Sequence, residues 1–233
     1  MENIVILTGA GVSAESGVPT FRDSGGLWEG HSIHDVATPE AFRRNPALVH
    51  RFYNLRRAAL PKCEPNPAHQ AIARLQHAFP GHVCLITQNV DDLHERGGST
   101  TVLHMHGELR KVFCIRCHHR LEWQDDLSTD HSCPACGRAG SLRPDIVWFG
   151  EIPYLMNEIE AAITRAKTFV AIGTSGLVYP AAGLVDIAKS VGAHTIEFNL
   201  NETESSKRFH EVRPGLASVT VPKWVTEVID STK

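Results

Sequence analysis

The sequence predicts an α/β protein with a doubly wound parallel sheet in a large lobe and a smaller lobe that carries a metal-binding module. Three observations support this fold class. Short apolar runs rich in β-branched residues alternate with helical patterns, which is typical of parallel sheets. A glycine-rich turn follows the first apolar run. Two closely spaced cysteine pairs lie in a loop-rich stretch that interrupts the alternation.

The composition is that of an ordinary globular chain. It has 233 residues, 42% of them hydrophobic and 21% charged, and 23 Lys+Arg against 26 Asp+Glu give a net charge of −3. This balance does not offer the basic face that nucleic-acid binding requires. No apolar run approaches the roughly 18–20 residues of a membrane span, and the N-terminus lacks a secretory signal pattern. We therefore expect a soluble, cytoplasmic protein with no nucleic-acid or membrane partner.

The N-terminal part begins with a buried strand and then becomes mainly helical. Residues 4–7 are a β-branched apolar run, which predicts a buried strand leading into the glycine turn. Proline in the first turn and Gly81 after the end delimit a helix over residues 67–79. The expected elements, in chain order, are a strand at 4–7, a helix at 39–60 broken near Asn45-Pro46, a helix at 67–79, and strands at 83–86 and 102–105.

After the loop-rich stretch 114–136, predicted strands and helices alternate again in the C-terminal part. The expected elements are strands at 146–149, 169–172, 195–198 and 219–221, and helices at 158–167, 181–191 and from 223 onwards. The segments without alternation are expected to form the small lobe, at about 31–81 and 108–144. The large lobe then comprises about 1–30, 82–107 and 145–233. No linker or internal repeat separates them, so we expect one module over 1–233.

Four cysteines form two C-x-x-C pairs that are separated by the 15 residues 118–132. Each pair can direct two thiolates at one point, and two pairs complete the tetrahedral sulfur shell that Zn²⁺ favours. Because four thiolates leave no open position for water, one structural zinc is expected. The alternatives are unligated surface cysteines or a redox dithiol. The predicted ligands are Cys114, Cys117, Cys133 and Cys136.

A zinc ribbon also raises the alternative of a nucleic-acid-binding protein. Residues 108–144 mix basic side chains with several acidic ones, and they offer no row of aromatic side chains for stacking on bases. A binding module of this kind would not need the large α/β body either. The sequence therefore disfavours this alternative.

The turn Gly9-Ala10-Gly11-Val12-Ser13-Ala14 follows the first strand and fits the pattern G-x-G-x-x-G/A. Its first glycine allows a tight turn, and its second lets the backbone approach a pyrophosphate. A dehydrogenase would show a second strand ending in an acidic residue about twenty positions later. The loop Phe21–Trp28 occupies that window instead, so hydride transfer fits poorly.

Small polar residues also follow three other predicted strands. Ligands of open α/β sheets collect at the carboxyl ends of the strands, where hydroxyl and amide groups suit phosphate and ribose. Ordinary turn chemistry is the alternative for each stretch taken singly. The three stretches are Gln88-Asn89-Val90-Asp91, Gly173-Thr174-Ser175 and Asn199-Leu200-Asn201.

Together these motifs resemble those of the sirtuins, which are NAD-dependent protein-lysine deacylases. The resemblance covers nearly the whole chain and is strongest towards the bacterial CobB type, class III. The matching stretches follow the family's order and distances; they are residues 9–13, 17–22, 87–91 and 106–107, the four cysteines, residues 173–175 and residue 199.

The resemblance implies a Rossmann-like large lobe and a small lobe made of the zinc ribbon and a helical insertion. It also implies NAD as co-substrate, with nicotinamide, O-acyl-ADP-ribose and free lysine as products. The residues that match NAD-binding positions are Gly9, Ala10, Gly11, Ser13, Ala14, Phe21, Arg22, Trp28, Gln88, Asn89, Val90, Asp91, Gly173, Thr174, Ser175, Asn199, Leu200, Asn201 and Ala217.

Two of the matched positions are catalytic. His106 matches the base that deprotonates a ribose hydroxyl, and an imidazole with an ordinary pKa of about 6.5 suits that task. Asn89 matches the residue that, with Asp91, orients the ribose and the nicotinamide amide. His104 lies two residues from His106 and therefore shares its strand face, so spacing alone does not distinguish them.

Tyr53 and Arg56 stand three residues apart on a predicted helix and share a face. A phenol and a guanidinium together suit a carboxylate, and the pair matches the Tyr-x-x-Arg motif of sirtuins that prefer succinyl- or malonyl-lysine. Ala37 matches a small residue that opens their acyl pocket. The alternative is a core tyrosine beside a solvated arginine.

The substrate is expected to be an acylated lysine side chain of a protein, bound as an added strand. The residues that resemble the family's substrate-docking strand are Val147, Trp148, Phe149 and Gly150. We expect a monomer that removes acetyl, succinyl and malonyl groups. A protein ADP-ribosyltransferase on the same scaffold is the alternative enzyme.

Overall fold

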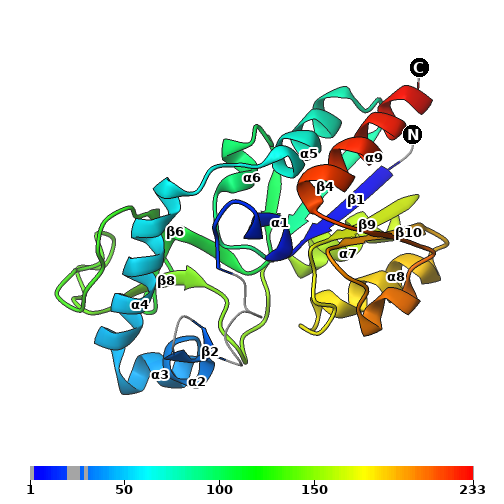
Figure 1. Cartoon of the computed structure of the whole chain (residues 1–233). Helices are drawn as coiled ribbons and strands as arrows, with labels where there is room; N and C mark the ends of the chain where they lie inside the picture. Colours follow the sequence, from blue (N-terminus) through cyan, green and yellow to red (C-terminus); the bar gives the residue numbers. More distant parts are fainter. Residues whose placement is uncertain (1–2, 20–26, 29–30, 233) are drawn as a thin grey trace.

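The centre of the molecule is a six-stranded sheet (Figure 1). The structure is a computed structural model that describes residues 3–19, 27–28 and 31–232. The strand order is β11-β10-β9-β1-β4-β5, and every neighbouring pair is parallel, which confirms the predicted class. The strands are β1 (Asn3–Thr8), β4 (His82–Thr87), β5 (Val102–His104), β9 (Thr168–Ile172), β10 (His194–Asn199) and β11 (Glu211–Pro214).

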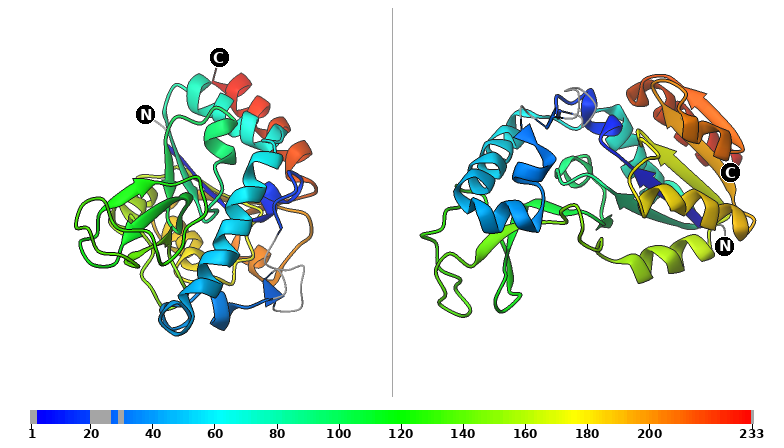
Figure 2. Two further views of the ribbon diagram at one scale, coloured as in Figure 1. Left: turned by 90° about the vertical axis from the view of Figure 1, so that its left-hand side faces the viewer. Right: turned by 90° about the horizontal axis from the view of Figure 1, so that it is seen from below.

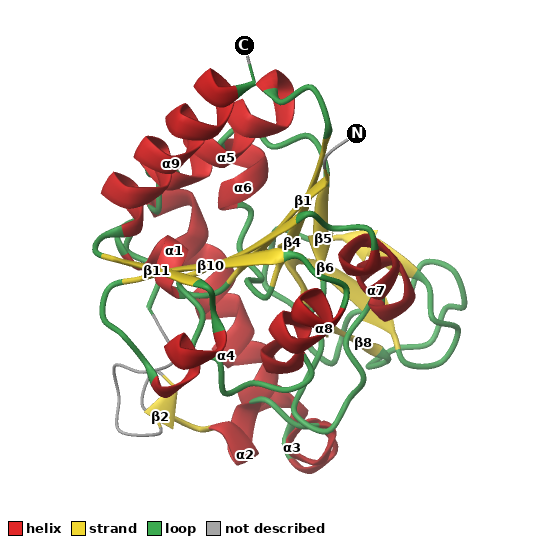
Figure 3. Ribbon diagram, turned by 90° about the vertical axis from the view of Figure 1, so that its right-hand side faces the viewer, coloured by secondary structure: helices red, strands yellow, loops and turns green. Residues whose placement is uncertain are grey.

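Helices cover both faces of this sheet (Figure 3). On one face lie α5 (Pro67–Ala78) and α9 (Ala217–Ser231), and on the other lie α7 (Met156–Thr164) and α8 (Leu184–Ser190). Within β1, Ile4 and Ile6 join the core under α5 and α9, while Val5 and Leu7 join the core under α7 and α8. A strand that is buried on both faces is apolar at every position. This is why residues 4–7 do not alternate between apolar and polar side chains.

A second sheet of three antiparallel strands forms the small lobe together with three helices (Figure 2). Its order is β7-β6-β8, and α4 packs against β6 and β8. The strands are β6 (Gly107–Cys114), β7 (Arg120–Glu122) and β8 (Leu142–Ile146), and the helices are α2 (Ile33–Val36), α3 (Pro39–Arg44) and α4 (Pro46–Ala59). Helix α5 lies within the range 31–81 that we assigned to the small lobe, yet it packs on the parallel sheet.

The helix starts follow their capping signals. The side chains of Thr38, Asn45 and Asn66 each accept a backbone N–H from the first turn of the following helix, and a proline comes next in each case. The cap at Asn45 explains the predicted break between α3 and α4. None of the helices in the described part of the chain has the length and hydrophobicity of a membrane span.

The remaining short elements connect these layers. They are α1 (Gly11–Ala14), α6 (Leu93–Arg96), the antiparallel pair β2 (Leu27–Trp28) and β3 (His31–Ser32), and the 3₁₀ helices η1 (Leu60–Lys62), η2 (Ala181–Gly183) and η3 (Glu204–Arg208).

The predicted strand at 219–221 is wrong. These residues lie inside α9, and the last strand of the sheet is β11. Their β-branched side chains favour a strand, but Val221, Trp224 and Val225 are buried at helical spacing against the parallel sheet. Tertiary packing of this face therefore overrides local propensity.

The predicted strand at 146–149 is also misplaced. Strand β8 ends at Ile146 and pairs with β6 in the antiparallel sheet, so it is not a member of the parallel one. Beyond it, the N–H of Val147 donates to the carbonyl of His106 at 2.9 Å, and the N–H of Phe149 donates to the carbonyl of Ala37 at 3.0 Å. The segment is held by loops on either side instead of by a strand ladder.

Candidate active site and metal centre

A cavity of about 890 Å³ lies at the carboxyl ends of the parallel strands and reaches the small lobe. It is lined by residues that follow β1, β4, β9 and β10, and by residues of α4 and of the segment after β8. Every described residue that we predicted for NAD or substrate lines this cavity, with Ser13 as the exception. Phe21 and Arg22 lie outside the described residues, and of Trp28 only the backbone is described.

The glycine turn after β1 packs directly against the turn after β9. The N–H of Gly9 donates to the carbonyl of Ile172, and the N–H of Gly11 donates to the carbonyl of Gly173, each at 2.9 Å. Gly173 has a φ of +62°, and a Cβ added there would lie 2.5 Å from the nitrogen of Val12. The two turns can approach this closely only without side chains, which leaves backbone groups facing the cavity.

The buried side chain of Ser13 hydrogen-bonds both Asn89 and Asp91. The amide of Asn89 donates to Oγ of Ser13 at 3.1 Å, and Ser13 also hydrogen-bonds Asp91. Asp91 accepts from the N–H of Leu93 at 3.1 Å, and burial raises the pKa of its carboxyl. Ser13 is thus buried and acts on the cavity through Asn89 and Asp91, two polar residues that line it.

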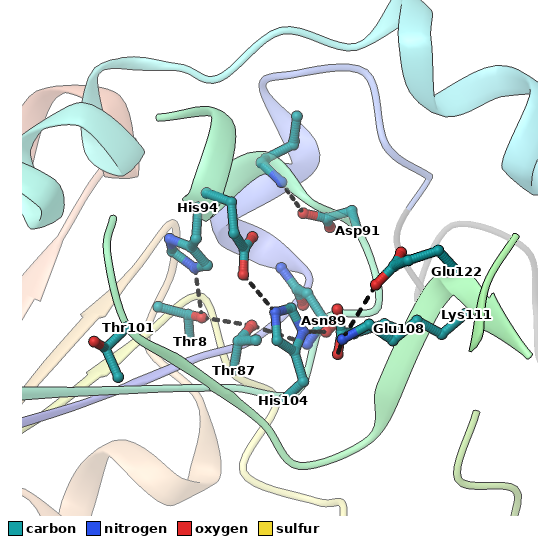
Figure 4. A network of polar contacts seen from close by, with 12 residues as sticks. Thr8, Thr87, Asn89, Asp91, His94, Thr101, His104, Glu108, Lys111 and Glu122 are labelled. Carbon is teal, nitrogen blue, oxygen red and sulfur yellow. Dashed lines mark hydrogen bonds and ion pairs between the residues drawn. The ribbon is translucent and has the colours of Figure 1, made fainter. Parts of the chain in front are cut away.

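Two buried histidines extend this network, and sequence reasoning missed both. His69 accepts the N–H of Asn66 at Nδ1, so its proton is on Nε2, which lies 3.4 Å from Oγ of Ser13. His94 lies 2.9 Å from Oγ1 of Thr8 through its Nε2 (Figure 4). Burial lowers the pKa of both imidazoles, that of His69 to about 4. They are therefore neutral at pH 7 and act as hydrogen-bonding groups in the core.

The structure separates the two candidate bases. His106 lines the cavity, and its Nδ1 lies 3.1 Å from the carbonyl oxygen of Gln88. A carbonyl only accepts, so the proton is on Nδ1 and Nε2 carries the free lone pair of a base. Burial lowers the pKa of His106, which favours this neutral form.

His104 is turned away from the cavity and paired with Glu95. Its Nε2 lies 2.7 Å from Oε1 of Glu95 (Figure 4). The side chain of His104 is 8% exposed. Burial opposes a charge on His104, but the hydrogen bond and charge of Glu95 outweigh burial and raise its pKa. His104 therefore has a structural role in the loop of Asn89, and His106 is the histidine that faces the cavity.

Tyr53 and Arg56 lie on α4 and line the same cavity, together with Ala37. The phenol of Tyr53 is fully buried, and burial raises its pKa to about 12, so it stays protonated. The neighbouring Arg57 is turned away, since its Nε donates to the carbonyl of Leu109 at 2.9 Å. Helix α4 therefore directs one arginine of its last turns into the cavity.

The four cysteines form one cluster, and each thiol is free of disulfides. Their Sγ atoms all lie within 4.8 Å of one another, with Cys114 3.7 Å from Cys136 and Cys117 3.6 Å from Cys133. A tetrahedron with Zn–S bonds of about 2.3 Å has edges of about 3.8 Å, close to these separations. The cluster can bind one zinc ion, and its complete set of sulfur ligands fits a structural role.

Several cavity residues carried no signal in the sequence. Cys63, Leu60 and Leu216 line the cavity, and Glu15 does so while its carboxylate accepts the N–H of Ser218 at 3.0 Å. None of them belongs to a motif or to a spaced pattern. Only the packing of distant segments brings them to the site.

We expect the purified protein to hold one zinc ion per chain, measured by elemental analysis. A strong chelator should lower Tm by about 10 °C or more, because structural zinc contributes several kcal/mol and each is worth about 2–4 °C at this chain length. Cys133→Ser should lose the metal, whereas Cys84→Ser, the control in the parallel sheet, should keep it. A protein without stoichiometric metal, or an unchanged Tm after chelation, would contradict this assignment.

Comparison with known proteins agrees with the motifs. The model of the Sir2 family matches residues 9–180. An NAD-dependent protein deacylase of Bdellovibrio bacteriovorus is 58% identical over 231 residues, which cover 98% of this chain and 97% of that protein. The NAD-dependent protein deacylase SIR2rp3 of Leishmania major is 55% identical, over 97% of this chain and 95% of that protein.

Solved structures show the same relationship. A Sir2 homologue in complex with NAD matches with a TM-score of 0.90 and 40% identity, over 99% of this chain and 91% of that chain. The complex of a Sir2 homologue variant with ADP-ribose matches with the same TM-score and identity, over 99% and 93% of the two chains. Matches of this extent, with the glycine turn, the cavity and the cysteine cluster described above, show that the chain belongs to the Sir2 family.

Proposed function

We propose that this protein is an NAD-dependent protein-lysine deacylase. The observation that carries the proposal is one cavity that holds the glycine turn after β1, the amide of Asn89 and the basic nitrogen of His106. A dinucleotide with its phosphates at the turn could then place its ribose near Asn89 and His106. Relatives named NAD-dependent protein deacylases, at 58% and 55% identity, support the same activity.

Different residues of the chain have different roles in this reaction. NAD supplies the ribose carbon that accepts the acyl oxygen when nicotinamide leaves. Asn89 and Asp91 orient the ribose and the nicotinamide amide. His106 removes a proton from a ribose hydroxyl through Nε2, since its Nδ1–H is anchored on the carbonyl of Gln88. The ribose hydroxyl then takes up the acyl carbon, one water molecule is consumed as the lysine amine leaves, and the products are nicotinamide, O-acyl-ADP-ribose and free lysine.

The proposed substrates include lysines with acidic acyl groups. Arg56 has a fixed positive charge, and Tyr53 has a neutral hydroxyl, and both residues line the cavity. Ala37 has no side chain beyond Cβ, which leaves space for a dicarboxylic acyl group. A succinyl or malonyl carboxylate would therefore meet two donors where an acetyl group meets none.

The acylated peptide is proposed to bind along the segment Val147–Gly150. Phe149 of this segment is 45% exposed, and Leu177 and Tyr179, which line the same cavity, are 73% and 72% exposed. Exposed apolar side chains beside a cavity suit an extended peptide that is held through its main chain, with little demand on its sequence.

Replacement of His106 by alanine should reduce kcat for deacylation by about 10²–10⁴-fold, the usual contribution of a general base. Binding of NAD, measured by calorimetry, should remain because the glycine turn is untouched. His82→Ala, an exposed histidine at the start of β4, serves as the control. Turnover by His106→Ala at the rate of the control would refute the role of His106. Labelled ADP-ribose that appears on protein, with no free O-acyl-ADP-ribose, would favour the transferase alternative.

The pH profile should follow the lowered pKa of His106. The base is active when neutral, and burial lowers its pKa below the ordinary value of 6.5, so protonation removes activity only at lower pH. The acidic limb of log(kcat/KM) should therefore have its midpoint below pH 6.5. A midpoint at or above 6.5 would contradict a buried, neutral His106.

Arg56→Met should lower kcat/KM for a succinyl-lysine peptide at least about 30-fold more than for the matched acetyl-lysine peptide. Loss of one partner of a buried charge pair costs about 2–5 kcal/mol, and each 1.4 kcal/mol is a factor of ten. Arg51→Met changes an exposed arginine of the same helix and is the matched control. Equal losses on both peptides would count against an acidic-acyl pocket.

A further inference from the structure

Arg143 and Glu151 form an ion pair with two hydrogen bonds beside the proposed peptide-binding segment Val147–Gly150. Nη1 of Arg143 lies 2.7 Å from Oε1 of Glu151, and Nη2 lies 2.8 Å from Oε2. The side chain of Arg143 is 5% exposed, and that of Glu151 is 28% exposed. A planar guanidinium that binds a carboxylate through two nitrogens fixes the orientation of the two groups as well as their distance.

The same pair also holds the backbone of the segment. Nη2 of Arg143 donates to the carbonyl of Ile146 at 2.7 Å. Oε2 of Glu151 accepts the N–H of Trp148 at 2.8 Å. The guanidinium carbon of Arg143 lies 3.4 Å from the centroid of the Trp148 indole. The pair therefore contacts the residue before the segment and the second residue of the segment.

A tight turn brings Glu151 back to Trp148. The N–H of Glu151 donates to the carbonyl of Trp148 at 2.9 Å, which closes a β-turn over residues 148–151. Gly150 has a φ of +91°, in the region that the third residue of a type II turn requires. The turn and the ion pair together fix both the N–H and the carbonyl of Trp148.

The N–H groups on either side of Trp148 also have partners. Val147 donates to the carbonyl of His106, and Phe149 donates to the carbonyl of Ala37. With the bond from Trp148 to Glu151, three consecutive N–H groups are therefore held by other residues. Because these acceptors all belong to the chain itself, the conformation of the segment does not depend on contacts with a peptide.

We propose that Arg143 and Glu151 are positioning residues for the acylated peptide. Their ion pair holds residues 147–150 in the conformation that an extended peptide binds, so the protein does not have to order this segment on binding. The inference rests on the proposed deacylase activity and on the proposed peptide-binding segment. It concerns the main chain of the peptide and not the acyl group, so it does not depend on an acidic-acyl pocket.

Two alternatives make different predictions. In the first, the ion pair only stabilises the fold. In the second, Glu151, which lines the cavity, acts on the acyl group directly through its charge. The contacts favour positioning, because both carboxylate oxygens bind Arg143, which offsets the charge, and one of them also holds the backbone of Trp148.

Four variants of the full chain separate these roles. Glu151→Ala removes the ion pair and the acceptor for Trp148, whereas Glu151→Gln removes the charge and keeps an oxygen that accepts. Arg143→Lys keeps the charge and loses the planar fork. Glu227→Gln is the matched control, because Glu227 binds Arg213 at 2.7 Å and lies outside the cavity lining.

The experiment measures kcat and KM with NAD for an acetyl-lysine peptide, a succinyl-lysine peptide of the same sequence, and a single acetyl-lysine with blocked ends. Glu151→Ala should raise KM for both peptides about 5- to 30-fold, the cost of ordering the backbone of one residue on binding. The value of kcat should stay within about twofold, because the imidazole of His106 is anchored separately on Gln88. The Kd for NAD, measured by calorimetry, should not change.

The other variants and the short substrate should show graded effects. Glu151→Gln and Arg143→Lys should raise KM for the peptides less than Glu151→Ala does, because each keeps part of the contacts. The single acetyl-lysine should be affected less than the peptides, because it lacks the main chain that lies along the segment. The succinyl-to-acetyl ratio of kcat/KM should stay constant, and Glu227→Gln should match the unaltered chain.

Three outcomes would overturn the inference while the proposed function stands. The first is an unchanged KM of Glu151→Ala for both peptides, even with a lower Tm, because the pair would then only stabilise the fold. The second is a rise of the succinyl-to-acetyl ratio in Glu151→Gln, which would indicate a direct effect of charge. The third is an equal rise of KM for the single acetyl-lysine and for the peptides.

Two further results are also decisive. If Glu151→Ala or Arg143→Lys does not fold, Glu151→Gln gives the same test, because it changes one partly exposed group and nearly keeps its shape. If the unaltered chain releases no nicotinamide from NAD with either peptide, the proposed function fails, and this inference fails with it.

Discussion

The close approach of two backbone turns is the constraint on which the site depends. A Cβ on Gly9 would lie 2.8 Å from the carbonyl oxygen of Gly173, and a Cβ on Gly11 would lie 2.7 Å from its Cα. Side chains are therefore excluded where β1 and β9 end. Because parallel strands point the same way, the turns after β4 and β10 reach the same edge of the sheet. Their hydroxyl and amide groups then surround a space that the backbone of the glycine turn borders without side chains, which lets a ligand such as a pyrophosphate approach the main chain.

The polar residues at this edge depend on a buried network of neutral groups. His69 and His94 lie side by side with ring centroids 4.8 Å apart, and both are kept uncharged by burial. Two charged imidazoles would repel each other there, so neutrality is a condition of the packing. The network fixes Ser13, and through it Asn89 and Asp91, without adding charge next to the cavity. His104, in contrast, is paired with the carboxylate of Glu95, outside the cavity.

Features that depend on local spacing could be predicted from the sequence, and features that depend on distant packing could not. Five strands of the parallel sheet, β1, β4, β5, β9 and β10, follow from apolar runs, and the cysteine cluster follows from C-x-x-C spacing, whereas β11 was not predicted. The strand predicted at 219–221 is wrong. Its side chains favour a strand, but Val221 packs against the sheet as part of a helix. Spacing placed His104 and His106 on one face, but β5 ends at His104 and the chain turns before His106. The partner of each histidine, which decides its role, comes from another element.

The small lobe connects the metal site to both sides of the proposed reaction centre. Strand β6 begins at Gly107, next to His106, and ends at Cys114, the first cysteine of the cluster. Strand β8 pairs with it and runs from Leu142 beside the cluster to Ile146, directly before the proposed peptide-binding segment. A metal that fixes one end of this pair therefore limits the freedom of His106 and of Trp148 at the other end. A zinc without an open coordination position would in this way preserve the distance between the proposed base and the proposed peptide-binding segment.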